Sequence, residues 1–308
     1  MAGASTPSAL QTQLWAGSIP LAIRLAKQES KTYESDVYLV YFPRISYLPL
    51  LHRRLHEFFF SSLIDQNVFP ADGWLSYEDV PLKWHYPVGL LFDLYSGASE
   101  QLHDQSGVEQ DQPDEILPWK LTLHFSDWPT EHLVRLDPDN DALRDAFRNS
   151  VKEACFLRHG SGKVIMSLSR EDSTKLWLAV EQQNLAMFNS VNQKLLHPPG
   201  VSLRYIPLKV YLPAAAAVDS TDQPSPGHLR VVQSLVTPTI STPKGQTQTL
   251  GMALNTLLPT LFPSRRSPLL ALPVLHGAVV PLSVPVETLA EVAAYADGFL
   301  HIAVVMMA

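Results

Sequence analysis

The chain has 308 residues, more than one typical hydrophobic core accommodates, and this length predicts two or three compact units. Hydrophobic residues make up 46% of the sequence and charged residues 17%, which is typical of a folded protein rather than a disordered one. The net charge of −7 leaves no overall basic surface, so we expect no nucleic-acid partner. The single cysteine, Cys155, excludes an intrachain disulfide and a thiolate-rich zinc site.

Neither end of the sequence carries a targeting or membrane-spanning pattern. The first residues lack the basic segment and the apolar run of a secretory signal. The apolar run at 299–308 is much shorter than the roughly 20 residues that a bilayer span requires, and it is expected to form a buried strand. We therefore expect a protein of the reducing cytoplasm.

The first third of the chain predicts strands and helices in a definite order. A strand of β-branched and aromatic residues at 37–42 ends at Pro43, and apolar residues at helical spacing follow it. The expected elements are an extended segment at 14–25, a strand at 37–42, a helix at 48–64, an extended segment at 74–84, a short helix at 89–95 and a strand at 119–125.

The last third repeats this order. The expected elements are strands at 203–212 and 229–236, a helix at 250–261, an extended segment at 269–280, a short helix at 286–295 and a strand at 299–306. Two strands, a helix packed across them and further strands that return to the same sheet form the β-grasp plan of ubiquitin-like folds. The sequence thus predicts an α+β protein with two ubiquitin-like β-grasp domains that flank a helix-rich domain.

The predicted domains have the following boundaries and insertions. We expect an N-terminal segment at 1–13, a first ubiquitin-like domain at 14–126, a helix-rich domain at 137–198 and a second ubiquitin-like domain at 201–308. Polar or Ala- and Pro-rich stretches predict mobile loops at 96–114 and 214–227. In the middle domain, Asp137 is expected to cap a first helix that ends near His159, and a second helix carries the residues from Trp177 to Leu195.

The first of these middle helices has a polar side that carries Lys152. At about 100° per residue, Leu143, Phe147, Val151 and Ala154 share one face, and Lys152 falls on the opposite, water-facing side. Phe156 lies one turn later on that same side, where an aromatic ring costs free energy unless something covers it. A solvated helix face with one stray aromatic residue is the simpler interpretation, and a binding or modification site is the alternative.

Residue patterns that support catalysis are largely missing from the sequence. His52 and His56 are spaced i, i+4, but the second histidine of an HExxH motif is absent, so we predict solvated histidines and no metal. Cys155 and His159 have the same spacing and leave open a thiolate–imidazole pair, although a small buried cysteine is the usual occupant of such a position. There is no glycine-rich phosphate loop, and no cofactor is expected.

Several short segments, in order from residue 14 to about 302, resemble the autophagy protein 5 family. The longest is Pro81–Asp93, which contains the block Trp84-His85-Tyr86-Pro87. The others are 14–20, 41–48, 118–125, 152–154, 175–177, 204–207 and 298–302.

This resemblance implies a conjugation scaffold rather than a catalyst. In the family, the ubiquitin-like modifier autophagy protein 12 is joined through its C-terminal glycine to one lysine of the helical region, and the matching residue is Lys152. The implied partners also include the N-terminal helix of autophagy protein 16 and, transiently, the E2-like enzymes of both conjugation systems. The assembly is expected to act like an E3 that promotes lipidation of autophagy protein 8, recruited peripherally to the preautophagosomal membrane.

Two sets of contact residues accompany the acceptor lysine. We expect Arg148, Asn149 and Phe156 to be covered by the attached modifier. Leu14, Trp15, Ile19 and Pro20 are candidates for the groove of the partner helix, unless Trp15 and Ile19 belong to the core of the first domain. Two alternatives stay open: an unmodified adaptor that binds its partners without a covalent bond, and an enzyme that uses Cys155 and His159.

Overall fold

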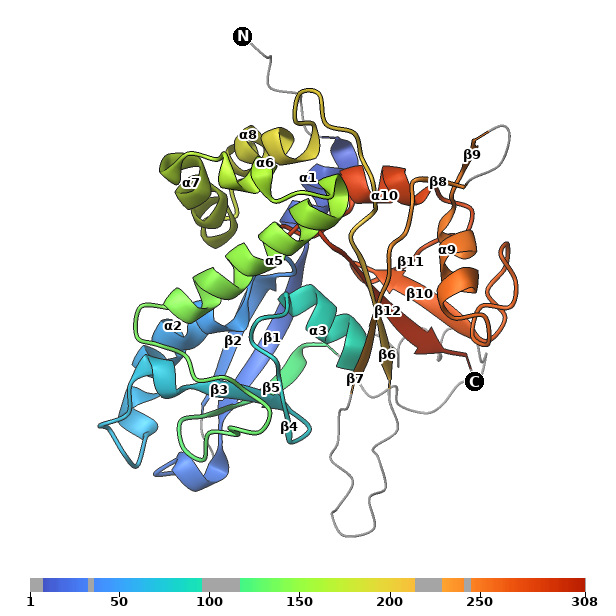
Figure 1. Cartoon of the computed structure of the whole chain (residues 1–308). Coiled ribbons are helices and arrows are strands. Elements are labelled where there is room, and N and C mark those ends of the chain that lie inside the picture. Colours follow the sequence, from blue (N-terminus) through green and yellow to red (C-terminus); the bar gives the residue numbers. More distant parts are fainter. Residues whose placement is uncertain (1–7, 33–35, 96–116, 214–228, 241–244, 308) are drawn as a thin grey trace. The chain divides into compact units, whose positions relative to one another are not determined.

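The computed structural model describes residues 8–32, 36–95, 117–213, 229–240 and 245–307 (Figure 1). The chain forms two compact units, which we describe separately. The N-terminal unit comprises residues 17–146, and the C-terminal unit comprises the described parts of 1–16, 147–213 and 229–308. The loops predicted at 96–114 and 214–227 lie outside the described residues.

The N-terminal unit is built on one five-stranded sheet with the order β2-β1-β5-β3-β4. The first and last strands, β1 and β5, are parallel neighbours at its centre, and the other pairs are antiparallel. This is the β-grasp arrangement that the order of elements predicts. The strands are β1 (Ser18–Leu25), β2 (Val37–Pro43), β3 (Trp74–Tyr77), β4 (Val80–Pro81) and β5 (Trp119–His124).

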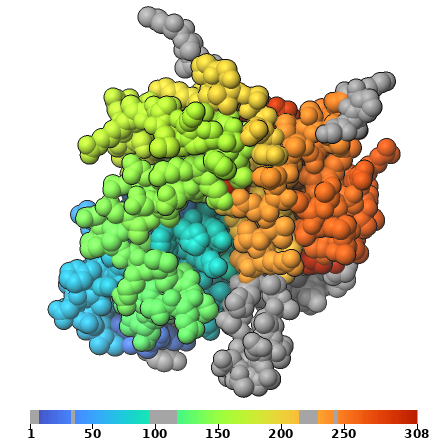
Figure 2. Space-filling view, viewed as in Figure 1, coloured from blue at the N-terminus to red at the C-terminus, as the bar shows by residue number. Residues whose placement is uncertain are grey.

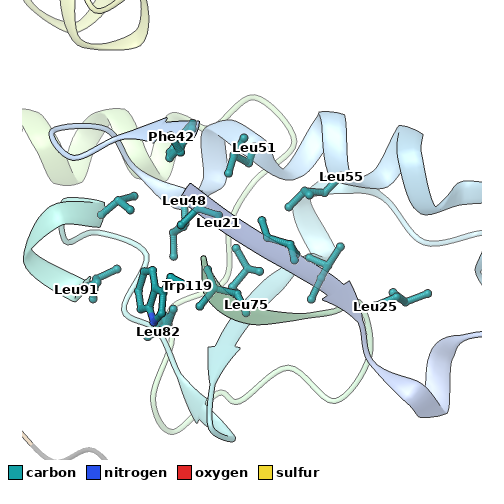
Figure 3. Close-up of a cluster of buried hydrophobic side chains, with 14 of the residues drawn as sticks. Leu21, Leu25, Phe42, Leu48, Leu51, Leu55, Leu75, Leu82, Leu91 and Trp119 are labelled. Carbon is teal, nitrogen blue, oxygen red and sulfur yellow. The ribbon is translucent and has the colours of Figure 1, made fainter. Parts of the chain in front are cut away.

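One face of this sheet buries the core of the unit. The helix predicted at 48–64 consists of a 3₁₀ turn at Leu48–Leu51, α2 at His52–Phe59 and a second 3₁₀ turn at Phe60–Ser62. Leucines from these elements and the completely buried Trp119 belong to one cluster of buried side chains (Figure 3). The short helix α3 (Val88–Tyr95) contributes Val88 and Leu91 to the same cluster. Further 3₁₀ turns lie at Lys27–Glu29 and Pro70–Asp72.

The prediction that His52 and His56 are solvated is wrong. The His52 side chain is 4% exposed because it occupies the same helix face as Leu48 and Leu55. Burial lowers the pKa of His52 to about 4, so the imidazole is neutral at physiological pH. His56 is half-buried, and its Nε2 lies 2.9 Å from the Val68 carbonyl oxygen. The described residues contain no group of three or more His, Cys, Asp or Glu that could hold a metal ion.

Helices make up one part of the C-terminal unit (Figure 1). The chain at 14–25 was expected to be extended, but its beginning is helical, as part of α1 (Ala9–Ala16). The second middle helix is also not continuous, because one helix ends at Glu181 and Asn184 caps the next by accepting a hydrogen bond from the Met187 N–H at 2.9 Å. The helices are α5 (Asp141–His159), of which residues 147–159 belong to this unit, α6 (Lys163–Met166), α7 (Arg170–Glu181) and α8 (Leu185–Leu196).

A second β-grasp sheet completes the C-terminal unit. Its order, β11-β10-β12-β6-β7, again places the first and last strands, β6 and β12, side by side and parallel. The strands are β6 (Leu208–Pro213), β7 (Leu229–Gln233), β10 (Ala271–Leu275), β11 (Ala278–Val279) and β12 (Leu300–Met306), with helices α9 (Leu250–Leu257) and α10 (Val286–Val292). A two-stranded sheet of β8 (Thr239–Ile240) and β9 (Gln246–Thr247) was not predicted.

The fold class predicted from the sequence is therefore confirmed, with one β-grasp sheet in each unit and helices between them in the sequence. No helix within the described ranges combines the length and the apolar character that crossing a bilayer requires.

Candidate functional site

The candidate site lies on α5, which the sequence predicts well. The helix begins at Asp141 and not directly after Asp137 as predicted, but the Asp137 carboxylate still accepts hydrogen bonds from the N–H groups of Asp141 at 2.8 Å and Ala142 at 2.6 Å. These backbone hydrogen bonds, with that of Ala142 the strongest, lower the pKa of the Asp137 carboxyl. The helix then continues to His159, where Gly160 adopts a left-handed conformation with φ of +68°.

Lys152 is exposed on this helix, on the side opposite the buried residues Phe147, Val151 and Ala154. Over the described part of the chain, its ammonium group makes no hydrogen bond or ion pair. The carboxylate of the neighbouring Glu153 could have formed an ion pair with Lys152, but it instead binds Lys209 and Gln233. The amine is thus accessible, attached to a regular helix and not held by a carboxylate. In Figure 2, α5 contributes to the visible surface of the molecule (green).

The three residues expected to contact an attached modifier differ in how exposed their side chains are. Asn149 is exposed, and Phe156 has 55% of its surface exposed. Arg148 is half-buried, and its Nη2 donates to the Ser173 hydroxyl at 3.3 Å. The exposed aromatic ring of Phe156 one turn after Lys152 is the feature of this surface that a solvated helix face does not explain.

The four residues proposed for a partner groove do not share one environment. Ile19 is 2% exposed in the core of the N-terminal unit, so it presents no surface to a partner. Pro20 lies beside it in β1 and is half-buried. Leu14 and Trp15 belong to α1 of the C-terminal unit, where the Trp15 ring lies 4.7 Å from the Phe188 ring in α8. Trp15 therefore does not belong to the first core, and the groove stays a prediction.

A buried polar network links α5 to the second sheet within the C-terminal unit. The Ser150 hydroxyl donates to Asp297 Oδ2 at 2.8 Å, and His301 Nε2 lies 2.9 Å from that same oxygen. His301 Nδ1 is 2.8 Å from the Tyr211 hydroxyl. Burial alone would raise the pKa of the Asp297 carboxyl. The electrostatic interaction with His301 and the hydrogen bonds of the network outweigh burial, so the pKa is lowered overall. Sequence reasoning missed this network; the one local signal was a hydroxyl on the apolar face of α5.

Cys155 and His159 do not form a catalytic pair. The His159 Nε2 lies 2.7 Å from the Leu195 carbonyl oxygen, and its Nδ1 has no hydrogen-bond partner among the residues that the structure describes. Cys155 is buried, and its burial raises the pKa of the thiol, although a hydrogen bond from the Ile165 backbone and the charge of Arg158 oppose this. A neutral, buried thiol is a poor nucleophile.

We accordingly expect Cys155 to react with iodoacetamide at pH 8 about ten-fold or more slowly in the native chain than in the urea-unfolded chain. The raised pKa reduces the thiolate fraction, and burial reduces access to it. Mass spectrometry of the alkylated peptide over time measures both rates. Equal rates would contradict the structure, and loss of biological activity on slow alkylation would reopen the hypothesis of a cysteine enzyme.

The fold and the site define a class of protein: two ubiquitin-like domains with a helical bundle between them in the sequence, and an exposed lysine on the first helix of that bundle. Three domain models of one known family match successive parts of the chain. Residues 14–125 match the UblA domain of autophagy protein ATG5, residues 140–198 its alpha-helical bundle region and residues 205–304 its UblB domain. The chain belongs to the autophagy protein 5 family.

Individual relatives agree with this assignment. The chain is 53% identical to autophagy protein 5 of Phaeosphaeria nodorum over all of both chains, and 51% identical to that of Neosartorya fischeri, over 97% of this chain and 96% of the relative. The crystal structure of Kluyveromyces marxianus Atg5 has the same fold, with a TM-score of 0.72 and 20% identity over 96% of this chain and 98% of that one. Family membership gives the chain a role in autophagy as a scaffold in ubiquitin-like conjugation.

Proposed function

We propose that Lys152 is the acceptor to which autophagy protein 12 is joined. The observation that carries this proposal is an exposed amine on a regular helix with no hydrogen-bond or ion-pair partner in the described ranges. An acceptor amine must reach into the active site of another protein, so exposure and freedom from a carboxylate both favour the reaction. The resemblance of residues 152–154 to the family's acceptor segment supports the same residue.

The chemistry is an acyl transfer from a thioester. The Lys152 Nζ attacks the thioester carbonyl that joins the modifier's C-terminal glycine to the cysteine of an E2-like enzyme. The C–N bond forms, the C–S bond breaks and the thiol leaves, while the ammonium proton is lost to the enzyme or to water. This chain supplies the nucleophile and its position, and the enzyme supplies the activated acyl group. Lys152 therefore acts as a substrate and not as a catalyst.

The remaining partners follow from the same proposal. Phe156 and Asn149, exposed beside Lys152, and the half-buried Arg148 would be covered by the attached modifier. The conjugate would bind the N-terminal helix of autophagy protein 16. The assembly would act like an E3 in the lipidation of autophagy protein 8, at the preautophagosomal membrane to which it is recruited peripherally.

We expect Lys152→Arg to abolish the conjugate. Arginine keeps the positive charge and the approximate length, but its guanidinium remains protonated and cannot attack the thioester. The measurement is an immunoblot of the chain in cells that express the modifier, in which the band heavier by one modifier should be missing. Lys163→Arg, at an exposed lysine of α6, is the matched control and should retain that band.

An unchanged heavier band in Lys152→Arg would show that another residue is the acceptor. Absence of any heavier band in the unaltered chain would favour the adaptor that binds its partners without a covalent bond.

A further inference from the structure

Three residues next to Lys152 attach α5 to the second β-grasp sheet. Glu153 is the first: its Oε2 lies 2.9 Å from the Lys209 Nζ, and its Oε1 accepts a hydrogen bond from Gln233 Nε2 at 2.9 Å. Lys209 in β6 and Gln233 in β7 are directly opposite each other in the sheet. One carboxylate thus spans a cross-strand pair, which fixes both the position and the direction of the side chain.

Lys209 is itself held in place. Its side chain is 17% exposed, and its Nζ lies 3.8 Å from the centre of the Phe299 ring. A cation over an aromatic face is attracted to it, and Phe299 is completely buried. The partner of Glu153 is therefore a restrained ammonium rather than a mobile surface lysine.

Ser150 makes the second attachment and Ala154 the third. The Ser150 hydroxyl donates to Asp297 Oδ2 at 2.8 Å, within the buried network described above. The Ala154 methyl group faces Gly298, whose backbone has φ of +89°, and a Cβ built on Gly298 would lie 3.1 Å from the Ala154 Cβ. Glycine at that position allows both the left-handed backbone and the close approach of the helix.

The three attachments share one side of α5. At about 100° per residue, positions 150, 153 and 154 cluster on one side of the helix, and position 152 points to the opposite side. Bonds at 150 and 153 prevent rotation of the helix about its own axis, and such a rotation would redirect Lys152. The attachments thus determine where the amine points relative to the second β-grasp sheet.

We propose that Glu153, Ser150 and Asp297 are positioning residues for acylation of Lys152. This inference rests on the proposed function, because it concerns how that lysine is presented. An enzyme that docks on the C-terminal unit would find the amine at a fixed place, so the bonds reduce the orientational freedom lost in the transition state. None of the three residues touches the reacting atoms.

The test is a single-turnover transfer of the modifier from the preloaded E2-like enzyme to the full-length chain at increasing chain concentration. We expect Glu153→Ala to lower the maximal rate about three- to ten-fold, and Ser150→Ala with Glu153→Ala to lower it by about 30-fold or more, since small misplacements are costly in acyl transfer. The concentration for half-maximal rate should stay unchanged. Glu171→Ala, which removes an exposed ion pair with Lys175 in α7, is the matched control and should transfer at the normal rate.

Two further measurements separate positioning from a general loss of structure. Acetylation of Lys152 by a small N-hydroxysuccinimide ester needs no docking, so its rate should be the same in all variants. Glu153→Gln should keep most of the transfer rate of the unaltered chain. The oxygen of the new side chain still accepts a hydrogen bond from Lys209, and its NH₂ group can donate to the side-chain oxygen of Gln233 once the Gln233 amide has rotated by half a turn.

Each outcome decides one claim. Transfer at the normal rate by both Glu153→Ala and the double variant would overturn the inference and leave the proposed function intact. A Glu153→Gln variant that transfers the modifier as slowly as Glu153→Ala would also overturn the inference, because the hydrogen bonds to Lys209 and Gln233 would then not be the cause of the fast transfer. Absence of transfer to the unaltered chain would refute the proposed function and this inference together.

Discussion

Replacing Asp297 with alanine is expected to lower the free energy of unfolding of the C-terminal unit by about 3 kcal/mol, because several buried groups that hydrogen-bond to its carboxylate are left without a partner. Asp297 is 4% exposed, and its carboxylate forms hydrogen bonds with the Ser150 hydroxyl, the His301 ring and the Phe299 N–H. Without it, the His301 Nε2 and the Ser150 hydroxyl lose their partner inside the protein. Urea unfolding followed by hydrogen exchange of the β12 and α5 amides measures the loss.

The control for this prediction is Asp172→Ala. The Asp172 carboxylate pairs with the ammonium group of Lys194 at 2.7 Å, but that lysine is 54% exposed, so the expected cost is about 1 kcal/mol or less. Equal costs for the two variants would contradict the assignment of Asp297 to a buried network.

The Asp297 network also has a predictable response to acid. The folded-state pKa of Asp297 is below its ordinary value of 3.8, so its stabilising contribution is complete above that value. The contribution is lost as the pH falls through the folded-state pKa. Asp297→Asn should therefore lack the part of the acid-induced loss of stability that sets in below about pH 3.8.

Acidification from pH 6.5 to 4 should remove about 3 kcal/mol from the stability of the N-terminal unit through His52 alone, by the conversion of pKa shift to free energy. The unfolded chain binds a proton on this histidine near pH 6.5, whereas the folded chain resists it until about pH 4, because burial penalises the charged form. Protonation therefore stabilises the unfolded state relative to the folded state throughout this interval. Burial lowers the pKa of His124 as well and acts in the same direction.

Urea unfolding at several pH values, with hydrogen exchange of the β1 and β5 amides as the local readout, tests this. His52→Leu fills the same buried position with an uncharged side chain and should flatten the profile between pH 6.5 and 4. His132→Gln, at an exposed histidine of the same unit, should leave the profile as it is. A His52→Leu profile identical to that of the unaltered chain would show that the histidine is not buried in solution.

The β-grasp sheets could be predicted because their strands carry local signals. Residues 37–42 are β-branched or aromatic and end at a proline, and residues 300–306 are almost entirely apolar. The amphipathic face of α5 likewise predicted which residues are buried, and Cys155 was among them. These signals depend only on neighbours along the chain, so a single sequence contains them.

Other features required the folded structure. Helix α1 buries no residue, so it has no apolar face to reveal it, and the apolar residues around Leu14 predicted an extended segment that in fact begins at Ser18. His52 could have been recognised as buried, since it stands four residues after Leu48 and three before Leu55 on one helix face. The hydrogen bond of Ser150 to Asp297 joins residues 147 positions apart, and a single sequence has no signal for it.

The central claim is that Lys152 is the residue that receives the modifier, and tandem mass spectrometry of the purified conjugate tests it most directly. Trypsin cleaves after Lys152 in the unmodified chain, but acylation blocks that cut. We predict a branched peptide from Asn149 to Arg158 that carries the C-terminal remnant of the modifier on the Lys152 Nζ. A conjugate with normal cleavage after Lys152, and with the remnant on another lysine such as Lys163 or Lys175, would contradict the account.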